Sequence, residues 1–230
     1  MLAVVGAMDE EIRYLISKVG ILSKETVGQT EVWQAEGPRG PFLIAKSGIG
    51  KVAAASSAQI LITKFAADRI IFSGVAGGLR DDIKRGDLVL AVDLVQHDFH
   101  LEAFGRKPGE IPGVGESVVC DGELARQFRK AYAEAAAENP GFPKLHEGRI
   151  ATGDCIVADS RLKKQITDTF GAIAAEMEGA ALGQVCKMNR VPFLVVRTVS
   201  DNADEDAIDD YGAFVRNAGE NDYQILKKFF

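Results

Sequence analysis

The chain of 230 residues is poor in cysteine, and the pattern of its cysteines excludes two classes of small fold. The three are Cys120, Cys155 and Cys186. An odd number at wide spacing forms neither a disulfide framework nor a zinc pattern, so we expect a reducing, cytoplasmic environment. His97 and His100 come without further ligands nearby, and no metal site is expected.

The sequence also lacks long apolar runs and an excess of basic charge. No apolar segment approaches the ~20 residues that cross a bilayer. The apolar stretch at the start of the chain has no basic region before it and is interrupted at Asp9. Neither a membrane span nor a signal peptide is therefore expected. A net charge of −6 argues against a nucleic-acid-binding surface. Without internal repeats or linkers, residues 1–230 are expected to form a single domain.

Short apolar runs alternate with helical patterns along the chain. The expected strands cover residues 2–6, 31–34, 42–46, 69–75, 87–95, 147–152, 172–176 and 191–199. The expected helices are one that begins at Asp9 and others over 51–65, 123–137, 160–170, 178–188 and 211–229. This alternation predicts an α/β protein, a three-layer α/β/α sandwich with a mixed, largely parallel central sheet. The runs RIIFSGV and VPFLVV are apolar throughout, which is typical of strands that helices cover on both faces.

Four segments at the ends of expected strands carry glycine, carboxylate or both. They are 6–8 with Glu11 after it, 74–78, 176–178 and 200–204. Ligands of α/β sheets gather at the carboxyl ends of strands. The sequence therefore predicts one pocket in which glycines allow close approach and three acids, Glu11, Glu178 and Asp201, can meet.

Taken alone, each of these signals has a simpler structural explanation. Glu11 could only compensate a helix dipole, and the glycines of 74–78 lack the GxGxxG spacing of a dinucleotide site. One of Glu176 and Glu178 could begin the helix that follows, and Asp201 could be an N-cap. The functional interpretation therefore depends on the combination.

In combination, eight phrases resemble the bacterial 5′-methylthioadenosine/S-adenosylhomocysteine nucleosidases of the purine nucleoside phosphorylase-like superfamily, over nearly the whole chain. They are VVGAMDEEI (4–12), KSGIGKVAAA (46–55), FSGVAGGL (72–79), VQHD (95–98), AFG (103–105), TGD (152–154), AEMEGAAL (175–182) and VVRTVSDNAD (195–204). The resemblance implies a phosphorylase/hydrolase-like fold and hydrolysis of the N-glycosidic bond of adenine nucleosides. The substrates would be methylthioadenosine and S-adenosylhomocysteine, with 5′-deoxyadenosine and 6-amino-6-deoxyfutalosine as further ones. A homodimer is implied, and no metal or redox cofactor.

The resemblance also implies a role for each candidate residue. Asp201 would protonate adenine at N7, with Ser200 orienting it, and Glu11 would activate the attacking water. Glu178 would bind the ribose 2′- and 3′-hydroxyls, with Met177 packed against the sugar. Arg197 would support the floor of the pocket, while the purine and ribose would be lined by Val75, Ala76, Gly77, Cys155, Ile156, Val157 and Glu176. The alkylthio group would meet Met8, Ile49 and Tyr211 and, from the neighbouring subunit, Leu101 and Phe104.

The chemistry of the reaction agrees with these roles. Breaking an N-glycosidic bond builds oxocarbenium-like charge on the sugar and negative charge on the purine, so an acid must meet the base while a carboxylate faces the ribose. To act as that acid, Asp201 must carry a proton near neutral pH. Glu178 as a carboxylate can accept two charge-assisted hydrogen bonds from the hydroxyls.

Three positions depart from the family pattern. Ile156 stands where many members have a phenylalanine that stacks on the purine, and Val75 replaces a serine or threonine. Arg106 stands where an aromatic residue often lies at the mouth of the 5′ site, and Asp209 and Asp210 come before Tyr211. Charges at this rim predict tolerance of a polar or larger 5′ substituent.

Two other functions stay open from the sequence. A purine nucleoside phosphorylase has the same fold, but it must bind a phosphate dianion, and the acidic turn Asp9-Glu10-Glu11 would repel one. A non-catalytic nucleoside-binding protein is the second alternative, although it would be expected to lack one of the three acids.

Overall fold

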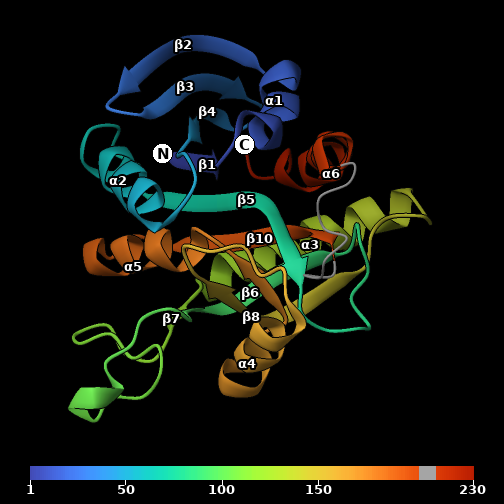
Figure 1. The fold of residues 1–230 in the computed structure, drawn as a ribbon. Helices are drawn as coiled ribbons and strands as arrows, with labels where there is room; N and C mark the ends of the chain where they lie inside the picture. Colours follow the sequence, from blue (N-terminus) through green and yellow to red (C-terminus); the bar gives the residue numbers. More distant parts are fainter. Residues whose placement is uncertain (202–210) are drawn as a thin grey trace.

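One sheet of ten strands organises the part of the chain that the computed structural model describes, residues 1–201 and 211–230, with side chains for 1–201 and 218–230 (Figure 1). The strands are β1 (Leu2–Gly6), β2 (Gly20–Val27), β3 (Thr30–Gly37), β4 (Gly40–Lys46), β5 (Arg69–Gly78), β6 (Leu88–Gln96), β7 (Val118–Val119), β8 (Leu145–Thr152), β9 (Ala174–Glu176) and β10 (Phe193–Asp201). The helices are α1 (Asp9–Lys18), α2 (Lys51–Thr63), α3 (Gly122–Glu138), α4 (Ser160–Phe170), α5 (Gly179–Asn189), α6 (Tyr211–Leu226) and a short 3₁₀ helix, η1 (Glu102–Phe104).

Strand β5 joins the two halves of this sheet. It pairs in parallel with β1 and β10 and antiparallel with β9. Because β10 connects through β6 and β8 back to β9, the strands β5, β10, β6, β8 and β9 close into a ring. Beyond β1 the sheet continues to β4 in parallel and then through β3 and β2 as antiparallel pairs. The predicted mixed sheet with parallel strands at its centre is confirmed.

Helices cover the central strands from both sides, as the apolar runs predicted. In Figure 1, α1 and α6 pack together on one side of β1 and β5, and α2 and α5 on the other. Ile70, Ile71 and Phe72 of β5 are completely buried, as are Leu194 and Val195 of β10. Burying each such side chain contributes about 1.5–3 kcal/mol, so the two central strands anchor the fold. Among the described residues, no helix is long and apolar enough to span a membrane.

The sequence interpretation missed one long strand and ended another too early. Seven of the eight residues of β2 are exposed, so its sequence shows no apolar alternation. The strand forms because the edge of β3 offers it backbone hydrogen bonds. Strand β5 continues past the predicted end at Val75 to Gly78, and Gly77 still pairs with both Asp201 and Ala175. Gly77 and Gly78, which follow the predicted end of this strand, are therefore part of it.

Candidate active site

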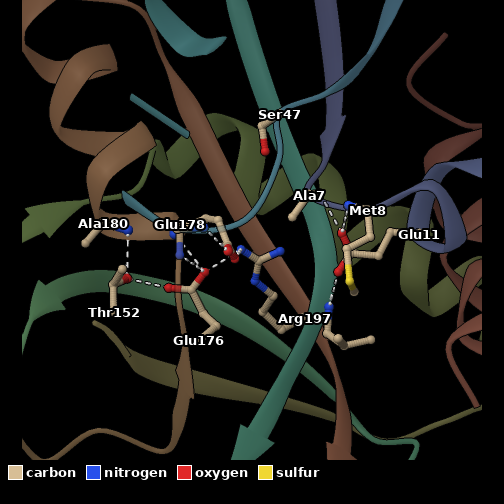
Figure 2. A network of polar contacts seen from close by, with 12 residues as sticks. Ala7, Met8, Glu11, Ser47, Thr152, Glu176, Glu178, Ala180 and Arg197 are labelled. Atoms are coloured by element: carbon tan, nitrogen blue, oxygen red, sulfur yellow. Dashed lines mark hydrogen bonds and ion pairs between the residues drawn. The ribbon is translucent and has the colours of Figure 1, made fainter. Parts of the chain in front are cut away.

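The ends of β1, β5, β9 and β10 meet at one place, and this juxtaposition creates the candidate site. Strands β1, β5 and β10 are parallel, so their carboxyl ends share one edge. Strand β9 runs against β5, yet it reaches the same edge because β5 extends to Gly78. Figure 2 shows the outcome: Glu11 lies on one side of Arg197, and Glu176 and Glu178 lie on the other.

The Arg197 guanidinium is the buried centre of this group. The residue is 1% exposed. Its Nη2 donates to Glu176 Oε2 and lies 3.7 Å from Glu178 Oε2. Its Cζ lies over the Phe72 ring, 4.2 Å from the centroid, which is close enough for a cation–π contact. The predicted place of Arg197 in the floor is consistent with this geometry.

Glu11 is held by backbone amides at the turn between β1 and α1. Its Oε2 accepts hydrogen bonds from the N–H of Ala7 (2.6 Å) and of Met8 (3.1 Å), and its Oε1 accepts one from the N–H of Val75 (3.0 Å). Burial raises the pKa of Glu11, while the positive charge of Arg197 and the three amides oppose that rise. The result is a fixed, enclosed carboxylate of the kind a general base requires.

Gly74 is the point at which Glu11 and Arg197 approach each other. A Cβ atom at this position would fall 2.3 Å from Arg197 Nη1 and 2.5 Å from Glu11 Oε1, so only glycine fits. Among the described residues, Nη1 has no hydrogen-bond partner. Arg197 therefore acts on Glu11 through its charge across the glycine.

Glu176 is buried, and its carboxylate is fully engaged by the protein. It accepts hydrogen bonds from the Thr152 hydroxyl and from the N–H groups of Glu178 (3.0 Å) and Gly179 (2.7 Å), in addition to Arg197. The two amides belong to the beginning of α5, where a carboxylate is favoured. Glu176 thus joins β9, β8, β10 and α5.

Glu178 lies two residues further on and has fewer protein partners. Its Oε1 accepts one hydrogen bond from the Gly50 N–H (2.8 Å), and its second oxygen lies at the longer distance from Arg197. Burial, together with the negative charge of Glu176, raises the pKa of Glu178 to about 7. Compared with Glu176, it keeps acceptor capacity for a ligand.

Asp201 is the last residue of β10 and sits beside Gly77 of β5. The Ser200 hydroxyl donates to Asp201 Oδ2 at 2.5 Å and lies 3.3 Å from the carbonyl oxygen of Ala76. The contact that the resemblance implied between Ser200 and Asp201 is therefore present, and it ties the acid to the end of β5.

The remaining predicted site residues differ in burial and place. Val157, Ala76 and Glu176 are buried, and Met8, Val75, Gly77, Met177 and Leu101 are partly buried. Cys155, Ile49 and Ile156 are exposed, the last at 74%. Phe104 is 82% exposed on η1, in a green segment that projects from the body of the fold in Figure 1. Tyr211 begins α6, but its side chain lies outside the described residues, as do residues 202–210 with the predicted rim acids Asp209 and Asp210.

Three charged residues that were not singled out from the sequence organise the loop before Cys155. Lys51 Nζ donates to Asp98 Oδ1 (2.7 Å), whose other oxygen accepts from the Asp154 N–H (2.9 Å). Asp154 Oδ1 in turn accepts from the Lys51 N–H (2.8 Å). All three occur in phrases already quoted, KSGIGK, VQHD and TGD, so a signal for them was present.

Known proteins resemble this chain in both sequence and fold. The model of the phosphorylase superfamily matches residues 1–230. The 5′-methylthioadenosine/S-adenosylhomocysteine nucleosidase of Shewanella pealeana is 35% identical over 221 residues, 96% of this chain and 94% of the relative. The structure of the same-named nucleosidase from Neisseria meningitidis in complex with methylthio-immucillin-A has a TM-score of 0.91 and 33% identity, covering 99% of this chain and 96% of that one. The futalosine hydrolase of Helicobacter pylori strain 26695 has a TM-score of 0.89 and 33% identity, covering 99% and 95%. By sequence and by fold, the chain belongs to the 5′-methylthioadenosine/S-adenosylhomocysteine nucleosidase family of the phosphorylase superfamily.

Proposed function

We propose that this protein hydrolyses the N-glycosidic bond of 5′-methylthioadenosine and S-adenosylhomocysteine, releasing adenine and the 5-substituted ribose. The observation that carries the proposal is the gathering of Glu11 and Glu178 around buried Arg197, with Asp201 at the end of the same strand as Arg197, beside Gly77 of β5. Family membership supports the same chemistry, since relatives over the full length bear this activity in their names.

The geometry suggests a division of roles in the reaction. As the bond between C1′ and N9 breaks, its electron pair moves into the purine, and Asp201 donates a proton to N7. A water molecule forms the new bond to C1′ and loses a proton to Glu11. Glu178 accepts hydrogen bonds from the ribose hydroxyls, next to the developing positive charge of the sugar. Glu176, whose carboxylate is already engaged, has a positioning role: it holds Arg197 and the start of α5.

Water is favoured over phosphate as the nucleophile. Anions bind where several backbone N–H groups converge. Here the amides of Ala7, Met8 and Val75 are already bonded to the Glu11 carboxylate. A phosphate dianion would have to displace this carboxylate or lie against it, and like charges in an enclosed site repel strongly.

The test is release of free adenine from methylthioadenosine by the purified protein, with and without inorganic phosphate. We expect equal rates in both and a loss of about 10²–10⁴-fold in kcat for Asp201→Asn. Asp168→Asn, which changes an exposed aspartate of α4, is the matched control and should retain full activity. Dependence on phosphate would favour the phosphorylase, and unchanged release by Asp201→Asn would overturn the role of the acid.

The range of 5′ substituents can be tested in the same assay. Arg106, predicted to favour a polar substituent, donates to Glu110 at 2.6 Å, so its charge is balanced within its own loop. A panel of methylthioadenosine, S-adenosylhomocysteine, 5′-deoxyadenosine and 6-amino-6-deoxyfutalosine would rank the substrates. If Arg106 selects the substituent, Arg106→Tyr should weaken S-adenosylhomocysteine turnover and leave 5′-deoxyadenosine unchanged; equal or better methylthioadenosine turnover with the others unchanged would contradict that selection.

We also propose a homodimer in which Leu101 and Phe104 complete the pocket of the neighbouring subunit. In support, Phe104 is almost fully exposed on a projecting segment, and Val119 and Met188 are further exposed apolar side chains. Sedimentation at micromolar concentration should give twice the chain mass of 24.7 kDa. Phe104→Ala should raise KM more than it lowers kcat; a fully active monomer would overturn the proposal.

A further inference from the structure

A further carboxyl group lies behind the candidate site, on α6. Asp222 is 8% exposed and accepts hydrogen bonds from the hydroxyls of Ser73 (2.6 Å) and Thr198 (3.2 Å). Ser73 precedes Gly74 in β5, and Thr198 follows Arg197 in β10. Because successive side chains of a strand point to opposite faces, these hydroxyls face α6 while Arg197 faces the pocket.

Asp222 and Glu11 line the same small cavity between β1, α1 and α6. Ser73 also contributes to its wall, and most of the rest is apolar, including Val5 and Leu15. The space left for the centre of a water molecule is about 10 Å³, enough for about one ordered water. With so little solvent between them, the two carboxylates interact more strongly than surface charges do.

Within residues 1–201 and 218–230, whose side chains are described, few other charges act on Asp222 from the elements around α6. Glu11 of α1 and Arg197 of β10 are the charged groups that influence it, while β5 presents the Ser73 hydroxyl. Between α3 and the chain end, the ion pair is that of Glu134 with Lys228, beyond the last residue of α6. Burial raises the pKa of Asp222 to about 6, against the two hydroxyl hydrogen bonds that lower it, and the charge of Glu11 adds to the rise.

We propose that Asp222 is a positioning residue for Glu11: from α6, across the small cavity that both residues line, it places a second negative charge near the base and so sets the pH at which Glu11 takes up a proton. The inference rests on the proposed role of Glu11 as the base. Three amides and Arg197 stabilise the Glu11 carboxylate and weaken it as a base. A like charge opposes them, so ionised Asp222 restores basicity without touching the substrate.

The decisive variant is Asp222→Asn, which keeps the shape of the side chain and removes its charge. At saturating substrate, where the ribose hydroxyls occupy Glu178, the acid limb of kcat should move to lower pH by about half a unit to one unit. The plateau of kcat should fall by roughly two- to fivefold because Glu11 becomes a weaker base. KM should not change, since Asp222 lies outside the pocket.

Two further variants separate this role from a structural one. Ser73→Ala keeps the Asp222 carboxylate but removes a hydrogen bond that favours its ionised form. The acid limb of kcat should therefore also move to lower pH, by less than in Asp222→Asn. Glu220→Gln removes an exposed carboxylate of the same helix, which accepts from the Tyr14 hydroxyl at 3.2 Å, and should leave the limb in place.

The outcomes distinguish this inference from the function on which it rests. An acid limb that stays in place in folded, active Asp222→Asn overturns the inference, even if the variant is less stable to heat. Should Asp222→Asn fail to fold, Ser73→Ala decides by the same criterion. If the unmodified protein releases no adenine at all, the proposed function itself fails.

Discussion

The two sides of Arg197 use the same kind of side chain in different ways. On the β9–α5 side, Glu176 bonds the guanidinium directly and is also bonded by a hydroxyl and two amides. On the β1–α1 side, the hydrogen bonds that Glu11 accepts from the described part of the chain come from backbone amides, and it meets Arg197 across Gly74. A carboxylate that is bonded directly to a buried cation has a structural role. One that is held by backbone amides can still take up and release a proton in a reaction. Glu178 lies between these extremes, with one amide and a longer ion pair.

The largest effect should come from the Glu11 side. Glu11→Gln removes the proposed base but leaves a side chain that can still accept from the amides, so kcat should fall by about 10²–10⁴-fold with little change in KM. Glu178→Gln should instead act mainly on KM, because it removes a charged partner of the ribose hydroxyls. Steady-state adenine release measures both parameters. The contrast between the two sides fails if both variants change the same parameter.

Glu176→Gln should affect stability before it affects chemistry. The change leaves the buried Arg197 without its directly bonded carboxylate, and breaking such a pair lowers the free energy of unfolding by about 3 kcal/mol. Urea denaturation would measure the loss. Glu178→Gln is the matched comparison and should cost less, because its ion pair with Arg197 is 3.7 Å long. Equal losses would show that the two glutamates are equivalent supports.

The pKa of Glu178, raised to about 7, predicts a pH dependence of substrate binding. Below pH 7 the carboxyl group gains a proton, so KM should rise by up to about tenfold per pH unit as the pH falls.

The effect of this group on folding has the opposite sign: the folded state holds its proton more tightly than the unfolded chain does. Stability from this group is therefore present below pH 4.5 and lost as the pH rises through 7. Both trends should disappear in Glu178→Gln; a KM that stays flat in the unmodified protein would contradict the ribose contact.

The smallest effect is expected at the rim of the pocket. Ile156→Phe would add an aromatic ring where an exposed aliphatic side chain stands. Stacking on the purine contributes about 0.5–1.5 kcal/mol, so KM for methylthioadenosine should fall by roughly two- to tenfold, with kcat unchanged. Ile156→Leu controls for shape without a ring. An unaltered KM in Ile156→Phe would indicate that the side chain does not reach the base.

Much of the fold could be predicted because its signals are local. Apolar runs such as RIIFSGV and the acidic first turn of α1 depend on neighbouring residues, and both predictions were confirmed. Strand β2 could not be predicted, since its exposed residues carry no pattern and only the edge of β3 makes it a strand. The end of β5 was set too early because Gly77 is held in the strand by two partners remote in sequence.

The site divides in the same way. The glycines and acids at strand ends, together with their order along the chain, were sufficient to indicate the family. Asp222 carried no such signal, because a single acid in a helix resembles any surface residue. The difference between Glu176 and Glu178 was equally hidden, since both are glutamates in AEMEG.

The amino-acid sequence alone therefore determined the α/β class, the family and the set of acids available for chemistry, because apolar periodicity and residue type are properties of the chain itself. Only the tertiary structure decided which acid engages Arg197, which one stays available for a ligand and which lies on α6 outside the pocket. Those roles depend on burial and on partners remote in sequence, such as Ser73 and Asp222, which are 149 residues apart. Proton affinity in a protein follows from such surroundings rather than from the residue type.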